Sequence, residues 1–423
     1  QEDNHLRAKE RNTRKNTAPI LEPSFLNEDF YIEDYREGQL QQVIEAVSDA
    51  THFLVVDPSQ FKIFSMIDGS KDDSMKMLVL DPDYASVNML IPDGNKKGYF
   101  RRENGNIGNC KIQSLTQMGM TTEQIQEIKS NGFFLQYRGE KSTLTLIPSK
   151  AFLATLCRHL GIGKLNSGPD GVRDIYLASR LRCAEEFAII YRKTANGYGK
   201  VFGCFSPKFA YMPQTVVFDF MDALSKLSGN ESYVTIRQWK ITHFYTSIYF
   251  TMDELVEVIG GVKITPGVCL TLSDVGDASY SLESTLYLNG GVVLFDDKIS
   301  RRHTGTVDAT EMVDEYSSKF QKLHDIMIQL HESLDINIPN KAKSAADLLK
   351  KIKFNTSFGI RNAIAYKDEY LTKSQKSCTG FDLYMEILKI PGIVHGIHRK
   401  ELEDQVSRSI GRVFDVNLKG VQE

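Results

Sequence analysis

A short basic segment between residues 298 and 305 has the residue types that bind phosphate. It contains Lys298, Arg301, Arg302 and His303, followed by Thr304 and Gly305. Arginine donates paired N–H bonds to phosphate oxygens, and hydroxyls and backbone amides at a turn before a helix add further donors. The segment therefore predicts an interaction with a nucleic-acid backbone. The alternative is structural, with Arg302 paired to a carboxylate of a sheet.

A second basic group lies on two expected strands and alternates with aromatic residues. It consists of Arg237, Trp239, Lys240, Phe244 and Tyr245. Aromatic rings beside cations can stack unpaired bases, as in proteins that bind single strands. The competing interpretation places Trp239, the only tryptophan, in the core. Arg237 and Lys240 join the first segment as candidate nucleic-acid-binding residues.

Patterns for metal or nucleophilic catalysis are weak. The six cysteines are widely spaced, without a Cys-x-x-Cys pair, and we expect them to be reduced and buried. The segment 161–164 lacks the spacing of a phosphate-binding loop, and the histidines at 395 and 398 lack a third metal ligand. We therefore expect no catalytic residue, metal or cofactor. A metal-dependent nuclease that uses Asp274, Asp277 and Glu283 remains open.

Periodicity and turn residues predict an α+β fold, with antiparallel sheets, flanking helices and a helical, basic C-terminal region. A helix is expected over 38–49, a second from a Thr121/Gln124 capping box to Gly132, and a third from Ser149 to Leu160. A Gly-rich stretch at 161–171 predicts a boundary. The expected parts are a basic arm at 1–20, an N-terminal domain at 21–160, a second α+β domain at 172–335 and a helical region at 344–423.

The second domain is expected to hold paired strands at 232–239 and 241–250 and a three-stranded meander between 267 and 295. Gly276 is expected to take a positive φ in the first turn of that meander, with Asp274 bonded to nearby backbone amides. Apolar residues at helical spacing then predict one long helix over 310–332.

The net charge of −3 conceals segregation along the chain. Residues 21–100 carry six Lys/Arg and fifteen Asp/Glu, whereas residues 341–400 carry twelve and five. The acidic and basic ends can be plain solvated surfaces or can guide a charged partner. No apolar run is long enough for a membrane span, and the first residues are too polar for a secretion signal. We expect a cytoplasmic protein without a membrane partner.

Three motifs occur in an order that resembles the phage/plasmid-like proteins, a family of unassigned function from prophages and conjugative plasmids. They are GCFSPKFAYMPQTVVFDFMDA at 203–223, the meander from Pro266, and Arg302-His303-Thr304-Gly305 before a helix. The resemblance covers roughly residues 180–390. It implies DNA biology of mobile elements and no established reaction.

Two hypotheses follow from these patterns. The first is a non-enzymatic, homo-oligomeric protein that binds DNA, chiefly single-stranded, during replication, annealing or recombination in the host cytoplasm. The second is a structural protein of the phage head or virion that binds other phage structural proteins. It draws on the final Glu423, since phage head maturation proteases resemble each other in cutting after glutamate.

Overall fold

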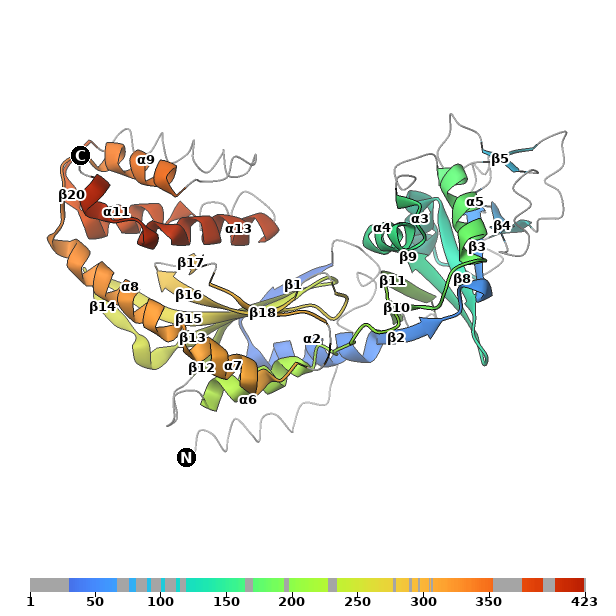
Figure 1. Cartoon of the computed structure of the whole chain (residues 1–423), viewed down its shortest axis with the longest axis horizontal. Coiled ribbons are helices and arrows are strands. Elements are labelled where there is room, and N and C mark those ends of the chain that lie inside the picture. The colour runs from blue at the N-terminus through green and yellow to red at the C-terminus, as the bar shows by residue number, and fades with distance from the viewer. Residues whose placement is uncertain are drawn as a thin grey trace.

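Two eight-stranded sheets lie side by side along the long axis of a curved molecule (Figure 1). The computed structural model describes residues 30–66, 76–80, 90–92, 100–102, 112–114, 119–163, 170–193, 198–226, 234–276, 279–288, 291–295, 297–303, 305, 307–352, 375–390 and 400–421. The C-terminal helices cover one face of the first sheet, and the remaining helices flank both sheets. The expected α+β class is confirmed.

The first sheet, sheet A, contains the predicted paired strands and meander. Its strands are β1 (Tyr31–Asp34), β12 (Val234–Thr242), β13 (Thr246–Met252), β14 (Glu257–Ile259), β15 (Val262–Leu272), β16 (Tyr280–Leu288), β17 (Gly291–Leu294) and β18 (Ile299–Arg301). The order is β1-β12-β13-β15-β16-β17, with β14 on β15 and β18 on β16, and these pairings are antiparallel. Gly276 has φ 75° at the β15–β16 turn, as expected.

The second sheet, sheet B, is assembled from both sides of the expected domain boundary. Its strands are β2 (Thr51–Val56), β3 (Phe61–Met66), β4 (Lys76–Leu80), β7 (Ile112–Ser114), β8 (Phe133–Arg138), β9 (Thr143–Pro148), β10 (Phe187–Lys193) and β11 (Tyr198–Phe205). β10 pairs antiparallel with β2, and β11 pairs parallel with β9. The stretch 161–171 therefore does not separate the sheets. In addition, β1 leaves the N-terminal part to pair with β12.

The helices are mostly those that local signals predicted. They are α2 (Glu37–Ala50), α3 (Thr122–Asn131), α4 (Lys150–His159), α5 (Asp170–Leu181), α6 (Val216–Lys226), α7 (Ala309–Ser317), α8 (Phe320–Glu332), α9 (Lys341–Lys351), α11 (Gly380–Ile387) and α13 (Lys400–Gly411). The Thr121/Gln124 capping box and the Ser149 cap are both present. Two short ribbons complete the strands: β5 (Leu90–Pro92) with β6 (Phe100–Arg102), and β19 (Asn337–Ile338) with β20 (Cys378–Thr379).

The expected single helix over 310–332 is two helices. The amides of Ser318 and Lys319 bond to carbonyls three residues back, at Glu315 and Tyr316, which interrupts the regular four-residue ladder. The apolar stripe nevertheless continues across the break. α7 packs in the core of sheet A, whereas α8 packs with α9, α11 and α13.

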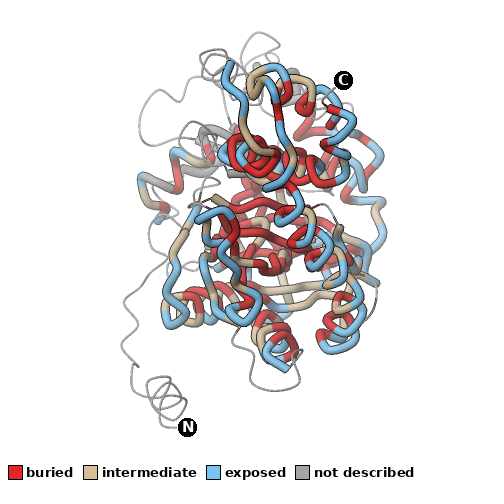
Figure 2. Tube along the Cα trace, turned by 90° about the vertical axis from the view of Figure 1, so that its left-hand side faces the viewer, coloured by how far each residue is buried: buried red, intermediate tan, exposed pale blue. Residues whose placement is uncertain are grey.

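Three large apolar cores hold the molecule together. One lies between sheet A and helices α2, α6 and α7, a second between sheet A and the C-terminal helices, and a third between sheet B and helices α4 and α5. Figure 2 shows buried segments in the interior and exposed turns at the periphery. None of the helices in the described ranges has the length and apolar composition that crossing a bilayer requires.

The cysteines differ in exposure, which corrects the expectation that all are buried. Cys183 is exposed and Cys378 is half-buried, whereas Cys157, Cys204 and Cys269 are buried. Burial raises the pKa of Cys157 to about 11 and those of Cys204 and Cys269 to about 12. These three thiols stay protonated at neutral pH, and a protonated thiol is a poor nucleophile.

We expect iodoacetamide to alkylate Cys183 in the native protein while the three buried thiols stay unmodified. Peptide mapping by mass spectrometry measures this directly, and alkylation in denaturant supplies the full-labelling control. Labelling of Cys269 at the rate of Cys183 would contradict the burial described above.

Candidate nucleic-acid interface

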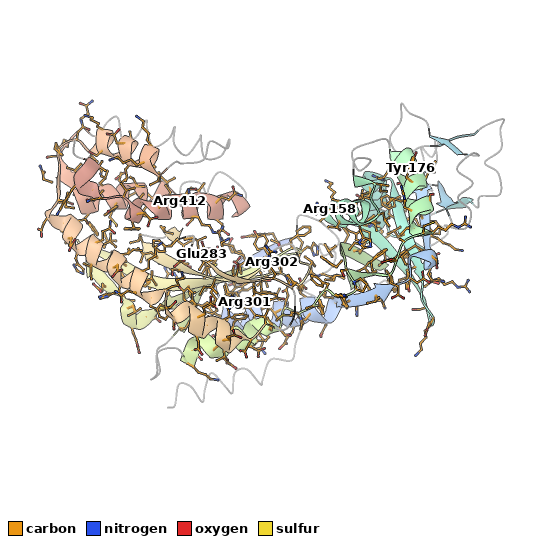
Figure 3. All side chains as sticks on the ribbon, in the orientation of Figure 1. Arg158, Tyr176, Glu283, Arg301, Arg302 and Arg412 are labelled. Atoms are coloured by element: carbon orange, nitrogen blue, oxygen red, sulfur yellow. The ribbon has the colours of Figure 1, made fainter. Side chains whose placement is uncertain are left out.

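The basic side chains of the 298–303 segment do not form one cluster. Lys298 and Arg302 are exposed. Arg301 forms an ion pair with Glu315 of α7, and the two side chains are 38% and 49% exposed. Arg302 directly follows the last residue of β18, and its side chain is exposed, whereas that of Arg301 is held at α7. Figure 3 labels the two arginines on either side of the ribbon.

His303 is packed against other rings. Its ring stacks on Phe209 with centroids 5.0 Å apart and lies 4.8 Å from the ring of Tyr280. Its carbonyl accepts a hydrogen bond from the amide of Ala210 at 3.3 Å. His303 therefore joins β18 to the segment that follows β11.

Arg237 and Lys240 lie elsewhere, on β12 of sheet A. Arg237 is exposed, and its guanidinium lies 5.5 Å from the centroid of the Tyr287 ring. Lys240 is only 1% exposed, and its Nζ lies 3.2 Å from the hydroxyl of Tyr249 and 3.6 Å from Asp404 of α13. A buried ammonium held in this way is not available to a phosphate, so Lys240 is excluded from the candidate site.

Trp239 is a core residue, as the competing structural interpretation expected. It is fully buried in the core beneath sheet A, and its Nε1 donates to the carbonyl of Arg36 at 3.0 Å. The alternation along β12 places Trp239 and Lys240 on opposite faces. The expected stacking surface on β12 is therefore not formed by Trp239.

The carboxylates considered for a metal-dependent nuclease are separated and paired. Asp274 accepts two bonds from Arg192, at 2.7 and 2.9 Å, instead of the backbone amides expected for it. Glu283 is bonded to the guanidinium of Arg408 of α13, at 2.8 to 3.0 Å. Asp277 lies outside the described residues. Among the residues that are described, no three His, Cys, Asp or Glu side chains gather closely enough to hold a metal ion.

A chain of stacked rings lies where the two sheets meet. Phe53 of β2 stacks on Tyr211 with centroids 5.6 Å apart and on Phe209 at 6.3 Å. Phe209 stacks in turn on Phe205 at 4.2 Å and on His303 at 5.0 Å. All five rings are half-buried. They join sheet B, the segment after β11 and β18 in one continuous aromatic cluster.

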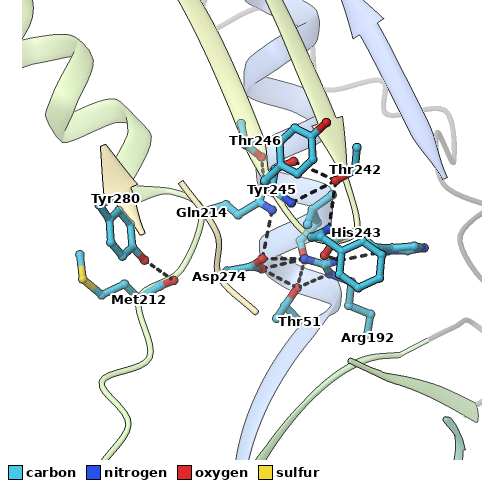
Figure 4. A network of polar contacts seen from close by, with 12 residues as sticks. Thr51, Arg192, Met212, Gln214, Thr242, His243, Tyr245, Thr246, Asp274 and Tyr280 are labelled. Atoms are coloured by element: carbon cyan, nitrogen blue, oxygen red, sulfur yellow. Dashed lines mark hydrogen bonds and ion pairs between the residues drawn. The ribbon is translucent and has the colours of Figure 1, made fainter. Parts of the chain in front are cut away.

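A buried ion pair close to these rings connects the two sheets (Figure 4). Arg192 of β10 and Asp274 after β15 are both fully buried. Arg192 also donates to the hydroxyl of Thr51 at 3.0 Å and to the carbonyl of His243 at 2.7 Å, and its guanidinium lies 5.0 Å from the Phe202 ring. The two opposite charges compensate each other, and the pair fixes the sheets relative to one another.

Burial also affects two tyrosine hydroxyls at the cluster, those of Tyr211 and Tyr280. The pKa of the Tyr211 hydroxyl is raised, first by burial and then by the nearby Asp274 carboxylate. The pKa of Tyr280 is raised by the same two causes in the same order. Both hydroxyls therefore remain protonated at neutral pH and add no negative charge beside the rings.

Two exposed cations are chain neighbours of rings in the cluster. Lys208 precedes Phe209 and Arg302 precedes His303, and both side chains are exposed. We call this set the joint surface: Phe53, Phe205, Phe209, Tyr211, His303, Lys208 and Arg302. It joins two of the sequence candidates to five residues that were not predicted as site residues, although four of them lie in the 203–223 motif. The dense aromatic spacing of Phe205, Phe209 and Tyr211 was the available signal.

Comparison with known proteins gives no further guide to this site. The chain matches no known family, no curated protein and no solved structure. The likeness to phage/plasmid-like proteins therefore remains an expectation from three short motifs.

Proposed function

We propose that the protein binds single-stranded DNA at the joint surface without catalysing a reaction on it. The observation that supports this best is the chain of half-buried rings from Phe53 to His303, in which Phe209 and His303 each directly follow an exposed cation, Lys208 and Arg302. Rings of this kind stack bases, and the adjacent cations bind phosphates. The resemblance of three motifs to those of mobile-element proteins also supports DNA binding.

Single strands fit this surface better than duplex DNA. Base stacking on aromatic side chains contributes about 1–3 kcal/mol per base, but it requires a base face that is free of its neighbours. A duplex keeps those faces covered and offers only its phosphates to Lys208 and Arg302. We therefore propose a preference for single strands that depends on the rings, and a salt dependence that depends on the two cations.

The test is binding of a fluorescently labelled oligonucleotide, single-stranded or duplex, followed by anisotropy across a salt series. The double variant Lys208→Ala/Arg302→Ala should weaken single-strand binding at least about tenfold. It should also lower the slope of log K against log salt by roughly 0.7 for each phosphate that the variant no longer binds. Phe209→Ala should weaken single-strand binding and leave the salt slope unchanged.

A matched control removes the same charge from another part of the surface. Lys226 at the end of α6 and Lys263 in β15 are both exposed, so Lys226→Ala/Lys263→Ala changes the net charge equally. Equal decreases in affinity in the two double variants would point to general electrostatic attraction and would remove the joint surface as the site. Unchanged affinity and salt slope in Lys208→Ala/Arg302→Ala would do the same.

A further inference from the structure

A separate hollow opens at the start of the first described helix. It has a volume of about 500 Å³, within the range of small-molecule sites, and is lined by Glu33, Asp34, Tyr35, Arg36, Arg237, Gln238 and Tyr287. These residues come from β1, the residues before α2, β12 and β16. None of them belongs to the joint surface.

The wall beside α2 is held in place by the chain itself. Asp34 accepts bonds from the amides of Tyr35 and Arg36 at 2.7 and 3.0 Å and is paired with the Arg36 guanidinium. The carbonyl of Arg36 is anchored by the buried Trp239 at 3.0 Å. This wall is therefore preorganised, which lowers the conformational cost of binding a ligand.

Two charges of the hollow, those of Asp34 and Arg36, compensate each other. Hydrogen bonding to the Arg36 side chain holds the pKa of Asp34 at about 2, so this ion pair persists at neutral pH. Glu33 accepts hydrogen bonds from Tyr31 at 2.7 Å and from the amide of Gln238. Outside the Asp34–Arg36 pair, the lining has two further charged groups, the Glu33 carboxylate and the exposed Arg237 guanidinium.

Arg237 decides which ligand chemistry fits. Its guanidinium covers one face of the Tyr287 ring, so a second cation meets like charge there instead of an open aromatic face. A guanidinium over a ring can still donate N–H bonds, and the spacing of two of its donors matches two phosphate oxygens. The arrangement therefore favours a phosphate over an ammonium group.

Tyr35 supplies the second interaction. Its side chain is 72% exposed, although it stands beside a preorganised wall and has a large apolar ring. An exposed ring at the mouth of a hollow provides a stacking face for a flat heterocycle. The Gln238 amide donates one N–H to the Glu33 carboxylate. The second N–H of the amide and the other lone pairs of the carboxylate can pair with the polar edge of a nucleobase, which a plain phenyl ring lacks.

We propose that this hollow binds a nucleoside monophosphate, with the base stacked on Tyr35 and the phosphate bound by Arg237. The site is distinct from the joint surface, because the two share no residue. It adds a small-molecule ligand to a protein that we otherwise propose to bind DNA strands.

The test is isothermal titration of the full chain with four probes: AMP, adenosine, inorganic phosphate and choline. AMP should bind at least about tenfold more tightly than adenosine, since a charge-assisted bond to phosphate adds to its affinity. Arg237→Ala should abolish that difference, and Arg237→Lys should restore only part of it because an ammonium lacks the fork. Tyr35→Ala should weaken AMP and adenosine alike, by at least about fivefold.

The control is the Lys208→Ala/Arg302→Ala variant, which should bind AMP as the parent protein does. That result separates this site from the joint surface, because either can fail without the other. The proposal is overturned if AMP shows no binding in the millimolar range, if choline binds in its place, or if Arg237→Ala leaves AMP affinity unchanged. Because Tyr35 and Arg237 are both exposed, these variants should fold normally.

Discussion

Replacement of Arg192 by alanine should destabilise the native protein by about 3–5 kcal/mol, the usual cost of leaving one member of a buried ion pair without its partner. The Asp274 carboxylate is fully buried and receives two of its bonds from this guanidinium, at 2.7 and 2.9 Å. The substitution also removes the bonds to Thr51 and to the His243 carbonyl. Chemical denaturation followed by circular dichroism measures the change.

A double-mutant cycle on the same pair measures how strongly its two side chains stabilise each other. Arg192→Met and Asp274→Leu each leave a buried charge, whereas the double variant leaves none. The double variant should therefore be more stable than the sum of the two single effects predicts, with a coupling energy of roughly 1–3 kcal/mol. Additive effects would show that the two side chains do not stabilise each other.

An exposed ion pair provides the matched control. Arg301 and Glu315 are 38% and 49% exposed, so water screens their attraction. Arg301→Ala should cost less than about 1 kcal/mol. A cost for Arg192→Ala as small as that of Arg301→Ala would contradict the view that the buried pair fixes the two sheets together.

The sequence predicted those elements whose signals are local. The Thr121/Gln124 capping box and the Ser149 cap each satisfy backbone amides within four residues. The turn at Gly276 needs a positive φ, and glycine alone adopts it without a steric penalty. In each case the residues that decide the structure are adjacent in the chain.

The domain boundary could not be placed from composition, because strand pairing in this fold is non-local. A glycine-rich stretch at 161–171 is typical of a linker, but β10 and β11 beyond it complete sheet B. Similarly, β1 crosses to sheet A and pairs with β12, which is far away in the sequence. The residues of β1 and of β10–β11 do not by themselves specify which strand each will pair with.

The candidate site was predicted only in part, again because its contacts join residues that are far apart in the sequence. Arg302 is exposed, whereas the sequence left open whether it binds phosphate or pairs with a carboxylate of a sheet. Burial of Lys240 follows from Asp404 and Tyr249, which come from α13 and from the neighbouring strand. The pairing of Arg192 with Asp274 joins residues that are 82 positions apart. Residue type alone gives no information on such partners.

Replacement of Gly411 by valine should destabilise the protein by at least about 2 kcal/mol, although local rules favour a side chain there. Gly411 ends α13 with φ −54°, a helical value that any L-residue adopts, and glycine in a helix costs up to about 1 kcal/mol relative to alanine. However, a Cβ added at Gly411 would lie well inside the van der Waals distance of the Leu294 carbonyl oxygen. Because the clash involves Cβ itself, no rotamer relieves it, and the helix must move.

That movement is costly because polar bonds fix the distance between α13 and β17. Ser407, one turn earlier, donates to the Val292 carbonyl at 2.8 Å and accepts from the Leu294 amide at 2.9 Å, and it is buried. A displaced helix would lengthen both bonds in a buried site. The control is Gly38→Ala in α2, where an added Cβ meets no atom within 4 Å and should stabilise by up to about 1 kcal/mol. Thermal unfolding of both variants distinguishes the two effects. A lower Tm for Gly411→Val with a higher Tm for Gly38→Ala supports close packing of α13 on β17. A rise in Tm for Gly411→Val would show that helix propensity governs this position instead.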